Sequence, residues 1–331
     1  MIVPSLARML VRECVYKPIT GKVLILGRQT IAMTYEQLIE LLKQEKFPIA
    51  DQVLKEVKMK YDSQTRIGKN TNYISDEVFF NLLGIKEFNV MDVSKYEGAD
   101  IIHNLNEPIP AALENQFDFI IDGGTFDHLL DLRVAFENVV KLLKVGGRIF
   151  QWNAASNFTG AAYISLGPDF FYDFYLLNKF IDCKVYIAAV DSFGQSELWD
   201  LYEFSGNEYG YFHSKRILMT LVISEKGLDS TSNRIPIQAQ YRDEHLRQAY
   251  MDRQKIISLS GRKSYQGSRF GVRVSKSKTN TLKGALINRA ALKYQENGLA
   301  WIFKRCLNEL SVFIKTHIRK EIPGYRYVGK I

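Results

Sequence analysis

Two carboxylates stand where apolar runs end, at positions suited to holding a ligand. Asp92 lies near the end of EFNVMDV, and Asp122 ends FDFIID just before the turn residues 123–125. A carboxylate at the end of a buried strand can accept hydrogen bonds from both hydroxyls of a ribose. The structural alternative for Asp92 is a surface side chain that caps the next turn near Ser94. Glycines at 123 and 124 would let a bound molecule approach the backbone closely.

A single histidine, His128, follows the second of these strand ends. Histidine side chains titrate near neutral pH, which suits a general base that removes a proton from a hydroxyl or an amine. The alternative is a residue in the first turn of a helix that is hydrogen bonded to Asp127 or to water. For Asp122, the alternative is that it caps the backbone amides that follow it.

The chain between residues 21 and 225 alternates short apolar runs with helical periodicity. The apolar runs predict strands, at 22–26, 87–93, 99–105, 117–121, 148–152, 183–190 and 216–224. The periodic segments predict helices, at 34–45 with Thr34 as its cap, 129–143, and 169–180 with an aromatic face expected to be core. Alternating strands and helices indicate an α/β fold with a doubly wound, mostly parallel sheet. Ligands of such sheets bind just beyond the carboxyl ends of the strands.

The composition is that of a globular protein. The chain has 331 residues, of which 46% are hydrophobic and 24% are charged. The three cysteines and five histidines form no disulfide framework and no metal-ligand spacing, so we expect no metal. The first residues do not resemble a secretory leader, and no apolar run approaches the ~20 residues that span a bilayer. We therefore expect a cytoplasmic location.

The positive charge is concentrated near the carboxyl end. Residues 260–331 contain 16 Lys and Arg against 3 Asp and Glu, whereas the remainder is mildly acidic. Residues 299–320 combine an apolar stripe with clustered basic side chains. An amphipathic helix of this kind suits peripheral contact with the anionic inner face of a membrane. Packing on the main domain with a solvated basic face is the other interpretation, and nucleic-acid binding has no supporting motif.

These patterns divide the chain into three parts. Residues 1–20 form an amino-terminal lead segment, and residues 21–225 form the α/β domain. Residues 49–83 are either a lid or a structural insertion within it. Residues 226–331 form a basic helical extension, with a linker near 260–284 and the amphipathic helix at 299–320.

Several motifs resemble those of class I S-adenosylmethionine-dependent methyltransferases. Residues 117–150 resemble the fourth strand, its helix and the "LLKPGG" turn of that family, with Val145 in place of proline. VMDVS at 90–94 resembles the second strand and its acidic end, and HNLNEPIP at 103–110 resembles the segment before the fourth strand. LGRQ, DGGTFDH and NAASNFTG together resemble a bacterial methyltransferase-like group often linked to polysaccharide biosynthesis.

The resemblance implies S-adenosylmethionine as cofactor and a small molecule or sugar as methyl acceptor. It implies a set of cofactor-binding residues: Gly27, Arg28, Asp92, Asn104, Asp122 and Gly123. Asp122 and His128 are the implied catalytic residues, with His128 as general base. Asn153, Asn157 and Tyr163 would bind hydroxyls of the acceptor. For Asn104, which would meet the adenine amino group, an ordinary Asx turn before Pro108 is the alternative.

The loop after the first strand departs from the family pattern. A glycine-rich GxGxG loop is expected there, but the chain has Gly27-Arg28-Gln29-Thr30. This loop favours a second hypothesis, in which the same fold is catalytically inactive and serves as a binding or scaffold protein. A nicotinamide-dependent oxidoreductase is disfavoured, because no GxGxxG follows the first strand.

Overall fold

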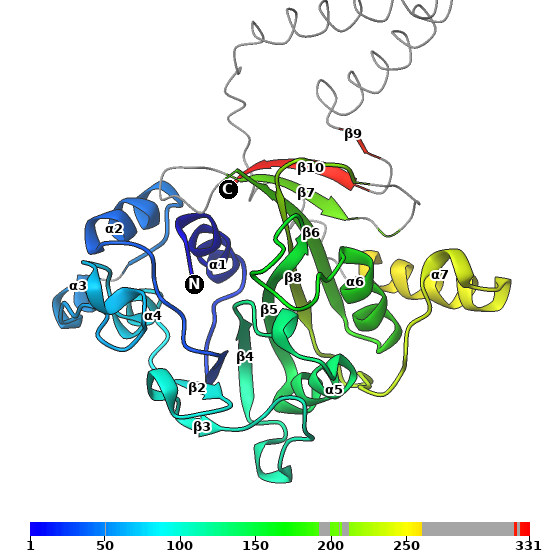
Figure 1. Cartoon of the computed structure of the whole chain (residues 1–331), viewed down its shortest axis with the longest axis horizontal. Coiled ribbons are helices and arrows are strands. Elements are labelled where there is room, and N and C mark those ends of the chain that lie inside the picture. The colour runs from blue at the N-terminus through cyan, green and yellow to red at the C-terminus, as the bar shows by residue number, and fades with distance from the viewer. Residues whose placement is uncertain (50, 192–198, 205, 207–211, 260–320, 323–324) are drawn as a thin grey trace, which may run out of the picture.

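A 10-stranded sheet with helices on both faces organises the chain (Figure 1). This computed structural model describes residues 1–49, 51–191, 199–204, 206, 212–259, 321–322 and 325–331. The helices are α1 (Pro4–Tyr16), α2 (Tyr35–Gln44), α3 (Asp51–Glu56), α4 (Asp76–Leu82), α5 (Leu132–Leu142), α6 (Pro168–Leu177) and α7 (Glu244–Leu259). The strands are β1 (Val23–Leu26), β2 (Phe88–Asp92), β3 (Ile101–Ile102), β4 (Phe117–Asp122), β5 (Leu143–Ser156), β6 (Asp182–Val190), β7 (Asp200–Phe204), β8 (Ile217–Glu225), β9 (Glu321–Ile322) and β10 (Tyr325–Lys330).

One half of the sheet is parallel. Its strands lie in the order β3-β2-β1-β4-β5, and each pairs in parallel with its neighbours. The chain order reverses on either side of β1, which creates the switch point at which sheets of this class bind ligands. Leu26 at the end of β1 pairs with Met91 in β2 and with Asp122 in β4, so the carboxyl ends of the three strands meet at one edge.

The other half of the sheet is antiparallel. β8 lies between β5 and β6 and is antiparallel to both, so β6 runs in the same direction as β5. β7 pairs with β6, and β10 then adds to the outer edge of β7. Segments more than 100 residues apart, such as Asp200 and Lys330, therefore lie side by side (Figure 1).

This strand order is that of a Rossmann-like methyltransferase fold, with a reversed strand between β5 and β6. The predicted doubly wound α/β architecture is confirmed. The sequence predicted a mostly parallel sheet. The antiparallel half is larger than that prediction implies, because β7, β9 and β10 extend it. The predicted linker near 260–284 and the amphipathic helix at 299–320 lie outside the described residues.

Two hydrophobic cores cover the two faces of the sheet. All four residues of β1 are buried, and they alternate between the faces: Val23 and Ile25 join one core, and Leu24 and Leu26 join the other. Side chains of α1, α2 and α4 fill the first core, and those of α5 and α6 fill the second. Strands buried on both faces are typical of parallel sheets covered by helices.

Aromatic rings hold α5 and α6 together. Phe136 of α5 contacts five rings at centroid distances from 4.3 to 5.8 Å, belonging to Phe126, Phe170, Phe171, Phe174 and Tyr175. Phe171 and Tyr175 are completely buried. The aromatic face of the helix predicted at 169–180 is therefore core, as expected, and buried ring pairs of this kind stabilise the packing beyond the area they bury.

Local signals set the helix ends. Thr34 forms a capping box at the start of α2: its side chain accepts a hydrogen bond from Gln37 N, and Gln37 Oε1 accepts one from Thr34 N. The helix predicted from residue 129 begins only at Leu132, because Phe126–His128 form a 3₁₀ turn and Asp131 caps the next helix by accepting from Val134 N.

The amino-terminal residues belong to the first core. α1 begins with Pro4 at its first turn and buries Leu6, Leu10 and other apolar side chains against α2 and the sheet. Its polar Glu13 is only 1% exposed and forms an ion pair with Arg148 of β5. In the part of the chain that the structure describes, no helix is long and apolar enough to cross a bilayer.

Candidate functional site

The carboxyl ends of β1, β2 and β4 form a rim around Gly27. This glycine has a φ of +68° and donates its N–H to Met91 O at 2.8 Å, which turns the chain sharply after β1. A Cβ on Gly27 would lie 3.4 Å from Thr125 Oγ1 and 3.9 Å from Asp92 Oδ2. The Asp92 carboxylate therefore faces the turn after β1.

Asp92 is the rim residue with the freest carboxylate. It is half-buried, and no described residue donates a hydrogen bond to its side chain or forms an ion pair with it. Its backbone is fixed, since its carbonyl accepts from His103 N at 2.9 Å. The side chain can therefore accept hydrogen bonds from a ligand without breaking a bond within the protein.

Arg28 binds protein groups rather than an open site. Its Nε donates to Glu97 O at 2.6 Å, its Nη2 donates to Gly98 O at 3.0 Å, and its Nη1 pairs with Asp76 at the start of α4. Burial raises the pKa of Asp76, and the charge of Arg28 opposes that shift. Arg28 was expected to contact the cofactor; in this structure it joins the turn after β2 to α4.

Gln29 occupies the space beside Gly123. A Cβ on Gly123 would lie only 2.3 Å from the end of the Gln29 side chain, so a larger residue at position 123 would require Gln29 to move. Gln29 is 5% exposed, donates to Gly27 O at 3.0 Å and accepts from the Met1 amino group at 2.5 Å. We expected Gly123 to make room for a ligand, but here it makes room for Gln29.

Asp122 is completely buried beneath the rim. Its Oδ1 accepts from Thr125 N at 2.8 Å and from Phe126 N at 3.4 Å, and its Oδ2 accepts from Gln151 and Asn153 at 3.0 and 2.8 Å. Burial raises its pKa to about 6, and the donors oppose that shift. With no exposed surface, Asp122 cannot touch a ligand in this conformation. The capping alternative describes its contacts, and its predicted catalytic and cofactor-binding roles are not supported.

Asp127 is the rim carboxylate that the sequence interpretation missed. Its Oδ2 accepts from Ala154 N at 2.9 Å, whereas its buried Oδ1 has no hydrogen-bond partner among the described residues. The residue is 5% exposed, and burial raises its pKa. A buried carboxylate oxygen without a donor is uncommon. The charges of His128 and of the Met1 ammonium act on this carboxylate and oppose the effect of burial on its pKa. The only signal in the sequence is its place directly before His128.

His128 and Tyr163 lie together at the surface of the rim. His128 Nε2 is 3.8 Å from Asp127 Oδ1, and the His128 and Tyr163 rings meet edge to face at 6.1 Å. The Tyr163 N–H donates to Asp127 O at 2.9 Å, which holds this segment beside the turn. Tyr163 is 78% exposed, and the His128 side chain is 54% exposed. The structure thus brings together one predicted catalytic residue and one predicted acceptor residue.

The three asparagines of the predicted site all bind within the protein. Asn104 forms an Asx turn, in which its Oδ1 accepts from Asn106 N at 3.1 Å. Asn153 is 0% exposed; it donates to Asp122 and accepts from Asp127 N at 3.1 Å. Asn157 Nδ2 donates to Ser214 O and Arg216 O at 2.8 and 2.9 Å. Asn153 therefore cannot bind acceptor hydroxyls here, and the Asn157 amide nitrogen is already engaged.

In the part of the chain that the structure describes, no group of three or more His, Cys, Asp or Glu side chains could hold a metal ion. The rim presents the half-buried carboxylate of Asp92, the buried Oδ1 of Asp127 and the exposed imidazole of His128.

The chain is similar in fold to solved methyltransferases. No protein-family model matches the sequence, and no curated protein matches it. The chain is 13% identical to a SAM-dependent methyltransferase of Thermotoga maritima described as a possible histamine N-methyltransferase, over 66% of this chain and 89% of that one, with a TM-score of 0.35. It is 11% identical to a SAM-dependent methyltransferase from Archaeoglobus fulgidus, over 66% and 94%, with a TM-score of 0.32.

A third similar structure is the CMeT domain of the citrinin polyketide synthase. The identity is 12%, the TM-score is 0.33, and the match covers 68% of this chain but only 52% of that one. At such identities a likeness concerns the fold alone. The strand order, with β8 reversed between β5 and β6, is what places the chain in the Rossmann-like methyltransferase fold.

Proposed function

We propose that the protein is an S-adenosylmethionine-dependent methyltransferase that acts on a small molecule or a sugar. The observation that carries the proposal is the free carboxylate of Asp92, which faces Gly27 at the switch point of the sheet. In sheets of this class, an acidic residue at that place binds ribose hydroxyls. A role in polysaccharide biosynthesis stays a prediction from the sequence motifs.

Three residues would act in the reaction. Asp92 would accept hydrogen bonds from the ribose hydroxyls of the cofactor, and the unpartnered Oδ1 of Asp127 would face its ammonium group. When bound, the cofactor supplies an electrophilic methyl group. His128, exposed at the rim, would remove the proton of the acceptor hydroxyl or amine as the methyl group is transferred. The rate would come mainly from holding the acceptor in line with that methyl group.

Calorimetric titration with S-adenosylhomocysteine tests the cofactor site. The wild-type protein should bind it, and Asp92→Asn should bind it roughly 10- to 100-fold more weakly, because hydrogen bonds to a charged group contribute about 1.5–3 kcal/mol. Glu87→Gln is the matched control, since Glu87 is exposed at the opposite end of the same strand. Equal affinity in the wild type and Asp92→Asn would remove Asp92 from the site, and no binding by the wild type would reject the proposal.

The second candidate function, a catalytically inactive binding or scaffold protein, is favoured by the loop after β1. Gln29 fills the space beside Gly123, and Arg28 is held by Glu97, Gly98 and Asp76. If the loop excludes the cofactor, the wild type should not bind S-adenosylhomocysteine, whereas Gln29→Gly should gain binding. Wild-type binding followed by methyl transfer from labelled S-adenosylmethionine would exclude this candidate.

A further inference from the structure

A cavity lies on the antiparallel half of the sheet. It encloses about 440 Å³, within the ~300–1,000 Å³ range of small-molecule sites. Its floor is formed by Ile187 of β6 and Leu218 of β8, and its walls by β7, β10 and the start of α6. None of the residues predicted to bind cofactor or acceptor lines it.

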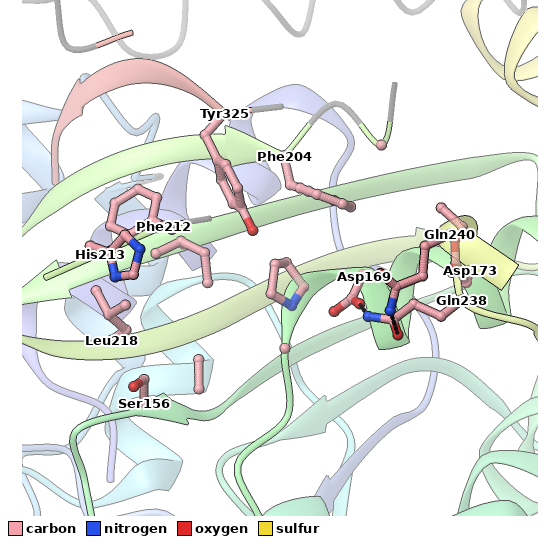
Figure 2. A pocket seen from close by; sticks show the side chains of 16 residues that line it. Ser156, Asp169, Asp173, Phe204, Phe212, His213, Leu218, Gln238, Gln240 and Tyr325 are labelled. Atoms are coloured by element: carbon pink, nitrogen blue, oxygen red, sulfur yellow. Dashed lines mark hydrogen bonds between the residues drawn. The ribbon is translucent and has the colours of Figure 1, made fainter. Parts of the chain in front are cut away.

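One wall of the cavity is aromatic. Tyr325 of β10 packs against Phe204 at a centroid distance of 5.2 Å and against Phe212 at 5.1 Å. Figure 2 shows Phe212 and His213 at one end of the cavity and polar side chains, such as Gln238, at the other end. Tyr325 lies between the two ends. Aromatic faces of this kind pack well against the flat C–H faces of a sugar ring, which are apolar although the ring edge carries hydroxyls.

The opposite end of the cavity carries polar side chains (Figure 2). Gln238 donates to Asp169 Oδ2 at 2.8 Å and accepts from Gln240 Nε2 at 3.3 Å, so the three side chains form a chain of hydrogen bonds. Gln240 Oε1 and the hydroxyls of Ser156 and Tyr325 make no hydrogen bond to any described residue. Burial raises the pKa of Tyr325 to about 12, so its hydroxyl keeps its proton and can donate.

The charges of the lining disfavour an anion. It contains the carboxylates of Asp169 and Asp173, and no lysine or arginine stands among its described residues. Arg242 is ion-paired to Asp173 at 2.5 Å and stacks on Tyr250, so its charge is balanced by Asp173. A phosphate or carboxylate would meet the negative charge of Asp169 here, whereas neutral hydroxyls would find both donors and acceptors.

Two short stretches of chain connect the lining of the cavity with the rim. Ala154 of β5 donates its N–H to Asp127, and its carbonyl accepts from Leu166 N at 2.7 Å. Ala155 and Gly167, which directly follow Ala154 and Leu166 in the chain, line the cavity. The cavity therefore borders the part of β5 that contacts Asp127.

We propose that this cavity binds an uncharged sugar residue. Given the methyltransferase activity proposed above, on which this last step rests, that sugar belongs to the methyl acceptor. The acceptor site then lies over β6, β7 and β10, beyond the segment at 153–163 in which the sequence placed it.

Saturation-transfer NMR with methyl glycosides of glucose, galactose, mannose, rhamnose and N-acetylglucosamine tests the proposal on the full chain. At least one glycoside should bind the wild type. Tyr325→Leu should weaken that binding by about tenfold or more, and Tyr325→Phe, which keeps the ring, by less. Tyr241→Ala is the matched control, because Tyr241 is 73% exposed next to Gln240 and outside the cavity lining. Glucose 1-phosphate should bind more weakly than methyl glucoside.

The outcomes separate this proposal from the proposed function. Cooperative unfolding of the Tyr325 variants in urea shows that they are folded, whether or not the protein binds S-adenosylhomocysteine. Glycoside binding that depends on Tyr325, without binding of S-adenosylhomocysteine, supports the sugar cavity and rejects the methyltransferase. Absence of binding by every glycoside, tighter binding of the phosphate, or equal binding by Tyr325→Leu overturns the sugar cavity while leaving the cofactor test untouched.

Discussion

At the scale of single residues, Asp122 and Asp127 show how two carboxylates five positions apart acquire different tasks. Side chains along β4 point alternately to the two faces of the sheet, and Asp122 points to the face covered by α6. There it accepts hydrogen bonds from Gln151, Asn153 and two backbone amides. Asp127 lies in the turn beyond the strand and uses only one of its two oxygens. The first fixes the turn, and the second is the residue to which the proposed function assigns the ammonium group of the cofactor.

The burial of Asp122 predicts a pH-dependent stability. Its pKa rises from 3.8 to about 6 on folding, so the folded protein binds the proton more tightly than the unfolded chain does. The contribution of Asp122 to stability is therefore largest below about pH 4, falls as the pH rises to about 6, and stays constant above about 7. Relative to the wild type, Asp122→Asn should gain stability on the order of 3 kcal/mol between about pH 4 and 7. Urea denaturation of both proteins across this range measures the difference, and a constant difference would contradict it.

Asp127 should distinguish ligands with and without a positive group. Asp127→Asn should weaken S-adenosylhomocysteine by about 10-fold or more, since it removes the charge that faces the ammonium group. It should leave the affinity for methylthioadenosine, which lacks that group, unchanged. Asp92→Asn should weaken both ligands equally. Calorimetry of the wild type and the two variants, each with both ligands, gives the comparison. Equal losses for Asp127→Asn with both ligands would assign Asp127 a structural role.

His128 should affect turnover rather than binding. His128→Gln should lower kcat by about 100-fold or more, as the loss of a general base does, and should leave the affinity for S-adenosylhomocysteine unchanged. His245→Gln is the control, because His245 is exposed on α7. The measurement is transfer of a labelled methyl group to the acceptor, and an unchanged turnover number would exclude His128 as the base.

Residue roles at the rim were only partly predictable. The alternation of apolar runs and polar ends located Asp92, His128 and the turn after β4. It could not show that Asp122 and Asn153 would face each other inside the sheet, because that depends on the register of β4 against β5 and on the cover provided by α6. Nor could it show that Gln29 would fill the space above Gly123.

At the scale of elements, ion pairs with distant partners allow α1 to pack against the core. Arg8 and Arg12 both pair with Glu45 at the end of α2, and Glu13 pairs with Arg148 of β5. The sequence identified residues 1–20 only as a lead segment, because the partners of these charged side chains come later in the chain. The strand predicted at 99–105 is shorter in the structure, because the Asx turn of Asn104 follows β3, which ends at Ile102.

The Glu13–Arg148 pair predicts a large effect of a single substitution. Both side chains are at least 95% buried, and Arg148 also donates to Lys17 O and Pro18 O at 2.8 and 3.0 Å. Glu13→Ala should lower the free energy of unfolding by about 3–5 kcal/mol, because it leaves a buried charge without its partner. Lys60→Ala should cost less than about 1 kcal/mol, since the Lys60–Glu77 pair is exposed. Urea denaturation measures the free energy of unfolding of both variants. Similar losses would show that the buried ion pair stabilises the fold no more than the exposed one.

At the scale of the whole molecule, the two ends of the described chain meet at one place. Ile331 exchanges backbone hydrogen bonds with Trp199, accepts from Ser5 Oγ at 2.8 Å and buries its side chain completely in the first core. Figure 1 marks this end of the chain beside β10. The sequence did not predict β7 and β10, because they are short strands of mixed polarity that pair across more than 100 residues. The parallel half was predictable because its strands are apolar and its helices periodic.

Ile331 should therefore contribute as much to the free energy of unfolding as a residue in the centre of the core. Ile331→Ala should lower the free energy of unfolding by about 2–5 kcal/mol, the usual range for such a truncation in a packed core. Leu228→Ala, at a position that is 84% exposed, should change it by less than about 0.5 kcal/mol. Urea denaturation gives both values. An effect at Ile331 as small as that at Leu228 would mean that the last residues are not part of the core in solution.

The late position of β10 has a consequence for synthesis. The strands that carry the rim are complete once the chain has passed Ser156, and β8 ends at Glu225, whereas Tyr325 is made 100 residues later. At roughly 5–20 residues per second, this leaves an interval of about 5–20 s on the ribosome. During that time β7 lacks its partner β10, and its outer edge is open to strands of other chains. Misassembly is therefore most expected in that interval.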